Sequence, residues 1–175
     1  LVSPFGWHDT NGVPGAEFTD TRGNNAHVQV GVVGADPPTT GGFRAVGGPD
    51  LEFDAVHDPF QVYTAEVNQE AATTNAFYWA NLHHDTLYGY GFDEGAGNFQ
   101  STNYTGLGSP GDQMQIDIQD PDVICNSNAL PGPEGVSPRF QFGFCNIALP
   151  TDIPGNQTTT DSALNNHTLI HEFTH

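Results

Sequence analysis

Three segments of the chain alternate apolar and polar residues with the period of two that predicts half-buried strands. They lie at 26–33, 113–118 and 140–144, and their apolar sets are Val28, Val30 and Val32, then Met114, Ile116 and Ile118, then Phe140, Phe142 and Phe144. A short strand is also expected at 51–54. The chain contains 21 Gly and 13 Pro. Turns and loops should therefore connect these strands.

Two segments follow the helical period instead. The longer, about 66–88, has no Gly or Pro before Gly89 and repeats apolar residues at helical spacing, so it predicts a central packing helix. The shorter, about 162–175, has an apolar stripe, and its candidate N-caps are Asp161, Ser162 and Asn165. We interpret the polar run His83, His84 and Asp85 in the longer helix as hydrogen-bonding within the fold, the alternative being a second metal site.

The shorter helix carries the pattern H-E-x-x-H in His171, Glu172 and His175. Residues four apart share one face of a helix, so the two imidazoles can reach one metal ion. Zinc favours imidazole nitrogens and lowers the pKa of a water molecule toward ~7. Glu172 would remove a proton from that water as general base. The alternative is an amphipathic helix with two exposed histidines.

A catalytic zinc ion normally has three protein ligands, and the pattern supplies two. His167 lies one further turn back, but the direction of the side chains drifts by about 40° for each four-residue step. We therefore expect the third ligand to come from elsewhere. A calcium site in the acidic cluster Asp50, Glu52, Asp54 and Asp58 is a further possibility, although a solvated acidic face is the simpler interpretation.

The net charge is -18, from 21 acidic residues and three arginines. This charge argues against nucleic acid or an anionic membrane as a partner, because both need basic patches. No segment approaches the ~20 apolar residues of a membrane span. The two cysteines, Cys125 and Cys145, would form a disulfide in a secreted protein, which we favour, and remain free thiols in a cytosolic one.

The segment T-N-A-F-Y-W-A-N-L-H-H-D-T-L-Y-G-Y-G-F-D-E-G-A-G-N-F-Q at 74–100 resembles the fungalysin family of secreted zinc metallopeptidases. The opening S-P-F-G-W-H-D, the segment N-Q-E-A-A-T-T-N at 68–75, S-P-R-F-Q-F at 137–142 and the final H-E-F-T-H resemble it too, in the same order. The resemblance therefore covers essentially the whole chain.

This resemblance implies an α+β fold, with residues 1–175 as the thermolysin-like N-terminal subdomain of a peptidase. A twisted, mostly antiparallel sheet would pack on the long helix, and the zinc helix would follow. The helical C-terminal subdomain, with a Glu as third zinc ligand and a residue that stabilises the oxyanion, would lie beyond this sequence. In such enzymes an Asn-Ala pair on an edge strand contacts the substrate backbone, a role that falls here on Asn128 and Ala129.

The expected function is that of a secreted zinc endopeptidase, or of its N-terminal portion, acting on peptides or proteins. Its partner would be the missing C-terminal half or a second chain, and the chain alone should show little activity. The alternative is a non-catalytic extracellular module that keeps the fold without a complete zinc site.

Overall fold

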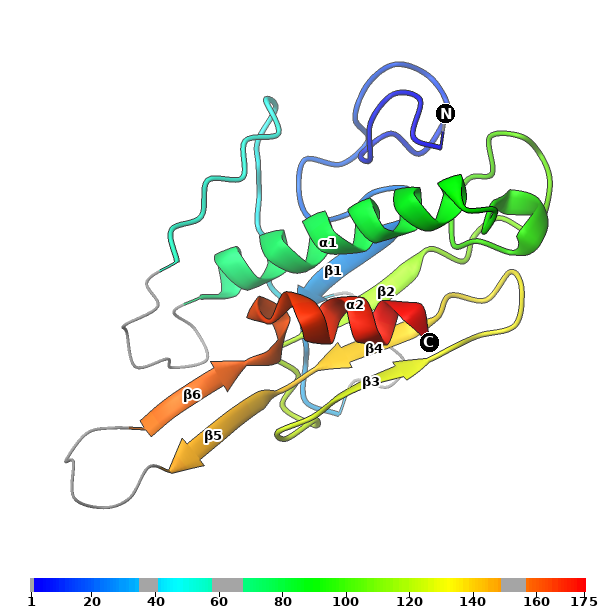
Figure 1. Cartoon of the computed structure of the whole chain (residues 1–175). Coiled ribbons are helices and arrows are strands. Elements are labelled where there is room, and N and C mark those ends of the chain that lie inside the picture. Colours follow the sequence, from blue (N-terminus) through cyan, green and yellow to red (C-terminus); the bar gives the residue numbers. More distant parts are fainter. Residues whose placement is uncertain (1, 35–40, 58–67, 149–156) are drawn as a thin grey trace.

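The computed structural model describes residues 2–34, 41–57, 68–148 and 157–175, and in them a four-stranded sheet lies under two helices (Figure 1). The sheet has the order β1-β2-β4-β3, and a separate pair joins β5 to β6. The strands are β1 (Ala26–Val30), β2 (Met114–Ile118), β3 (Ser127–Leu130), β4 (Arg139–Phe142), β5 (Phe144–Ala148) and β6 (Gln157–Asp161), and the α-helices are α1 (Gln69–Gly89) and α2 (Asn166–Thr174).

The predicted α+β class is confirmed, but the prediction of a mostly antiparallel sheet is wrong for these four strands. β1 pairs with β2 and β2 with β4 in parallel, and only β3 pairs antiparallel with β4. Parallel neighbours need a crossover connection, and the chain between β1 and β2 includes α1. Periodicity predicts that a strand exists, but not the direction of its neighbour.

The apolar face of the sheet carries the core. Met114, Ile116 and Ile118 of β2 are buried, as the alternation predicted, and they align with Ala26 and Val28 on β1 and with the phenylalanines of β4. α1 and α2 cover this face with small and aromatic residues that are also buried: Ala72, Ala76, Phe77, Ala80, Leu169 and Phe173. α1 ends at Gly89, and Gly91 follows two residues later, close to the predicted limits.

The opposite face of the sheet is polar yet buried. Arg139 Nε donates to Asp117 Oδ2 over 3.1 Å, and Gln29 Nε2 donates to the other oxygen over 2.9 Å. Burial raises the pKa of Asp117, although the bonds from Gln29 and Arg139 oppose that effect. One of the three arginines of the chain is thus used inside the sheet, where buried charges must be paired.

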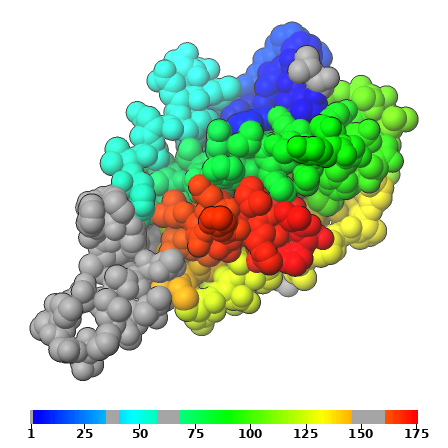
Figure 2. Space-filling view, in the orientation of Figure 1, coloured from blue at the N-terminus to red at the C-terminus, as the bar shows by residue number. Residues whose placement is uncertain are grey.

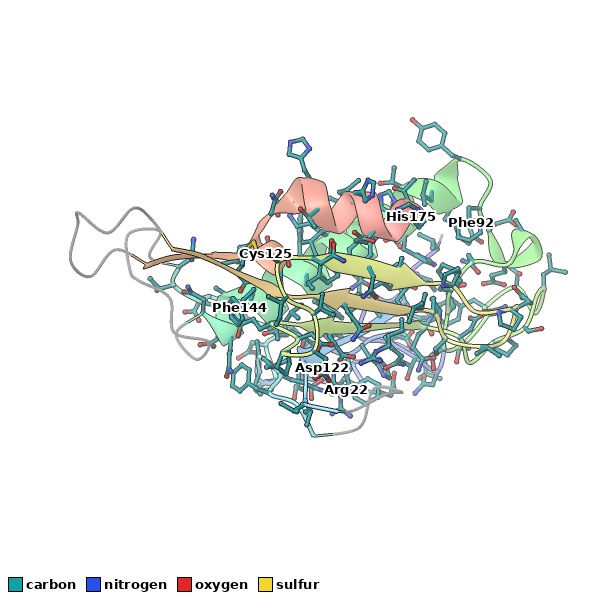
Figure 3. The ribbon with its side chains drawn as sticks, turned by 90° about the horizontal axis from the view of Figure 1, so that it is seen from below. Arg22, Phe92, Asp122, Cys125, Phe144 and His175 are labelled. Atoms are coloured by element: carbon teal, nitrogen blue, oxygen red, sulfur yellow. A yellow bond between two sulfur atoms is a disulfide. The ribbon has the colours of Figure 1, made fainter. Side chains whose placement is uncertain are left out.

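The predicted strand 140–144 is divided at Gly143 into β4 and β5. A Cβ atom at Gly143 would collide with the carbonyl oxygen of Val123, so only glycine allows the two backbones to approach so closely here. Next to this point Cys125 and Cys145 form the predicted disulfide, visible beside α2 in Figure 3. It joins the segment before β3 to β5.

Two further expectations are corrected. No strand forms at 51–54, because Leu51 adopts a positive φ of 55°, outside the β region; Phe53 there stacks on the His8 ring, at 5.6 Å between centroids. The predicted helix 162–175 divides at Asn165 into a 3-10 turn, Ser162–Leu164, and α2. Neither described α-helix is long and apolar enough to cross a membrane.

Candidate metal centre

α2 begins at a strong N-cap. The Asn165 side-chain oxygen accepts hydrogen bonds from the backbone N–H groups of His167 and Thr168, at 3.1 and 3.4 Å. Leu169 and Phe173, four residues apart, are buried against the sheet. These contacts fix the rotation of α2 about its own axis. The face that carries His171 and His175 is therefore turned to solvent. Figure 2 shows α2 at the surface, between α1 and the β3 region.

His171 and His175 lie on that solvent-facing side and converge. Their Nε2 atoms are 3.0 Å apart, and their rings are 4.7 Å apart at an interplanar angle of 87°. Two nitrogens bound to one tetrahedral zinc ion at ~2.0–2.1 Å are roughly 3.4 Å apart. A small rotation of the side chains would open the pair to that separation, so the two imidazoles fit a zinc ion.

Glu172 lies one step around the helix from this pair, on the side that borders β3. The residue is 6% exposed, and its Oε1 accepts a hydrogen bond of 2.6 Å from Ser127 Oγ on β3. Sequence reasoning missed Ser127, because no local pattern identifies a hydrogen-bond partner 45 positions away. The only signal was its place beside the Asn-Ala pair on the predicted edge strand.

A third ligand is not found in the part of the chain that the structure describes. Among the described residues, no group of three His, Cys, Asp or Glu side chains is placed to hold a metal ion, so the third ligand, His167 as an alternative and the calcium site all stay predictions. The acidic residues at 50, 52 and 54 are exposed, and Asp58 lies outside the described residues.

The histidines of α1 are used within the fold, as expected. His84 is buried, with Nδ1 3.2 Å from Asp85 Oδ1 and Nε2 3.2 Å from Asn98 Nδ2. Since a carboxylate only accepts and an amide nitrogen only donates, a neutral imidazole protonated on Nδ1 satisfies both partners. His83 Nε2 lies 3.3 Å from Thr174 Oγ1, a contact between the two helices. Burial lowers the pKa of His83, and the neighbouring His84 adds to the effect.

β3 is the edge strand of its sheet, as predicted for the residues that would bind substrate. Asn128 pairs with Gln141, and Ala129 pairs with Phe140, so the two side chains of the Asn-Ala pair face opposite sides. Ala129 lines an apolar hollow of about 350 Å³ that also reaches His175, with walls from Leu87, Phe92, Phe99, Phe140 and Phe173. Figure 3 shows Phe92 near the end of α2 that carries His175.

A family model described as the fungalysin metallopeptidase (M36) matches residues 1–175. The chain belongs to this family. Among curated proteins it is 32% identical to the extracellular metalloproteinase MEP of Leptosphaeria maculans and 34% identical to extracellular metalloproteinase 2 of Trichophyton tonsurans. Each match covers 99% of this chain and 25% of the relative. This fungalysin chain therefore spans about a quarter of the length of those relatives.

Proposed function

We propose that this fungalysin chain is the zinc-binding N-terminal portion of a secreted endopeptidase. The observation that carries the proposal is the convergence of His171 and His175, 3.0 Å apart at Nε2, beside the buried carboxylate of Glu172. Zinc bound by the two imidazoles would supply a Lewis acid, which acidifies water and polarises a peptide carbonyl. Membership of a metallopeptidase family and relatives named extracellular metalloproteinases support the same conclusion.

Glu172 would act as the general base. Its carboxylate would accept a proton from the attacking water and pass it to the leaving amine nitrogen. The third ligand would come from a part of the longer protein, since the relatives are about four times as long as this chain. These arguments favour the enzyme over a non-catalytic extracellular module.

The substrate would be a peptide in extended conformation. Within the described part of the chain β3 is an edge strand, and its outer side would offer backbone N–H and C=O groups to such a peptide, in the manner of an added strand. Asn128 and Ala129 would contact its backbone. An apolar side chain of the peptide would enter the hollow that Ala129 and His175 line.

The test uses the full-length protein that contains this chain, with zinc content and casein hydrolysis as readouts. Glu172→Gln should keep one zinc per molecule and lower kcat by about 10²–10⁴-fold, because it removes only the base. Glu70→Gln, the same change at an exposed position on α1, is the matched control and should leave both readouts unchanged. Undiminished hydrolysis by Glu172→Gln would contradict the proposal.

A further inference from the structure

One hydrogen bond joins the proposed general base to the strand proposed to bind substrate. Ser127 Oγ donates to Glu172 Oε1 over 2.6 Å, the length of a charge-assisted O–H···O bond. Within the described residues, this is the one hydrogen bond of the Glu172 side chain, and it engages Oε1 alone. One oxygen of the carboxylate is therefore held, and the other is left for chemistry.

The position of Ser127 is fixed by packing on both sides. In the register of β3 with β4, Ser127 pairs with Phe142, so its side chain shares the helix-covered face of the sheet. Phe142 packs on Phe173 of α2, at 5.8 Å between ring centroids. Phe173 follows Glu172 in sequence. The contact that seats the helix on the sheet thus aims Glu172 at the first residue of β3.

The disulfide restrains the same end of the strand. Cys125 precedes Ser127 by two residues and is bonded to Cys145 on β5. The backbone N–H of Cys125 also donates to the Phe144 carbonyl oxygen over 2.7 Å. The hydroxyl of Ser127 therefore projects from a doubly anchored backbone, which is the condition for a side chain that positions another.

We propose, on the basis of the function proposed above, that Ser127 is a positioning residue that orients Glu172 for general-base catalysis. It holds Oε1, so that the carboxylate presents Oε2 to the water molecule. The hydroxyl keeps its own proton throughout, and the proton from water resides on Oε2. A free glutamate would sample several rotamers, and only some of them place an oxygen correctly for proton transfer.

Threonine and valine at position 127 form a matched pair, because they have the same shape and differ in the hydroxyl. A cavity of about 250 Å³, lined by Cys125, Asn126, Ser127 and Thr168 among others, gives room for the additional methyl group. β-branched residues also suit a strand. The comparison of Ser127→Thr with Ser127→Val thus isolates the hydrogen bond from the packing.

The experiment measures kcat, KM, zinc content and the crystal structure of both variants in the full-length protein. Ser127→Thr should keep kcat within about twofold of the wild type, and Ser127→Val should lower kcat about tenfold with KM changed less than twofold. Zinc content should stay the same in both. The Glu172 carboxylate should occupy its wild-type position in the Thr variant and leave it in the Val variant. Ser127→Ala replaces Val if that variant does not fold.

Three results would overturn the inference: equal kcat for the Thr and Val variants, a loss confined to KM, or an unmoved carboxylate in the Val variant. In a Glu172→Gln background the Thr and Val variants should be equally slow, because the base they orient has gone. Failure of the proposed function would give a different result. The wild-type protein would then show no zinc-dependent hydrolysis, or a hydrolysis that Glu172→Gln does not reduce.

Discussion

His83 and His84 lie near the C-terminal end of α1, and His171 and His175 lie near the C-terminal end of α2. The two pairs differ in burial and in the partners of their ring nitrogens. Both ring nitrogens of His84 are occupied by Asp85 and Asn98, and its side chain is buried. The Nε2 atoms of the α2 pair face each other at the surface, 3.0 Å apart. Two helices of one fold thus place the same residue type in a buried hydrogen-bond network and at the exposed surface.

The spacing accounts for most of this difference. Adjacent residues on a helix point about 100° apart, so His83 and His84 cannot converge on one ion. His83 turns to Thr174, while His84 turns into the interior. Residues four apart point in nearly the same direction, which brings the α2 pair together. Burial then decides whether the nitrogens remain available for a ligand.

The largest expected effect is the loss of metal after a change in the α2 pair. His171→Ala or His175→Ala should abolish stoichiometric zinc binding in the full-length protein and reduce casein hydrolysis to background, because each removes one of the imidazole ligands. Elemental analysis of protein dialysed against buffer measures the bound zinc. The matched control is His83→Ala, which should retain one zinc per molecule; zinc loss in this control would break the comparison.

A smaller effect is expected from His84→Ala, and it should appear in stability. The change leaves the Asn98 amide and the Asp85 carboxylate without one partner each and opens a cavity, so unfolding should become easier by about 2 kcal/mol. For a chain of this size that corresponds to a decrease in Tm of roughly 4–8 °C. Calorimetry gives the shift.

The zinc content of the His84→Ala variant is the second measurement. His84→Ala should bind zinc at the wild-type stoichiometry, since His84 takes no part in the α2 site. A variant with unchanged Tm and lost zinc would show that the roles assigned to the two helices are reversed.

The sequence predicts those parts of the molecule that depend on local spacing. The face formed by Met114, Ile116 and Ile118, the helix over about 66–88 and the convergence of the two α2 histidines all follow from periods of 2.0 and 3.6 residues. Here the pattern is sufficient, because neighbours in sequence determine which side chains share a face.

Contacts between distant segments were not predictable in this way. The parallel pairing of β1, β2 and β4 depends on how the chain crosses over the sheet, and alternation is the same for either direction. The bond from Ser127 to Glu172 depends on the register of β3 and on the rotation of α2 together. The disulfide was predictable only from the assumption of a secreted protein.

The comparison of buried with exposed histidines also predicts how stability depends on pH, because burial disfavours the charged imidazole. Burial, with Arg44 and Arg22 nearby, lowers the pKa of His27 to about 4. Below pH 6.5 the unfolded chain therefore binds more protons than the folded one, and stability falls as the pH decreases from 6.5 towards 4. His27→Gln should remove about 1–2 kcal/mol of the loss between pH 7 and pH 5. Urea unfolding of zinc-free protein at both pH values measures it.

The smallest expected effect belongs to His83, at the contact between the two helices. Its pKa is lowered by burial and by His84, so the sign is the same as for His27: stability is complete above pH 6.5 and decreases as the pH falls. His83 is only partly buried, so water screens part of the penalty. In the same urea series, His83→Gln should reduce the acid-induced loss by less than His27→Gln does. A larger effect at His83 would mean that the contact with Thr174 is a principal support of α2.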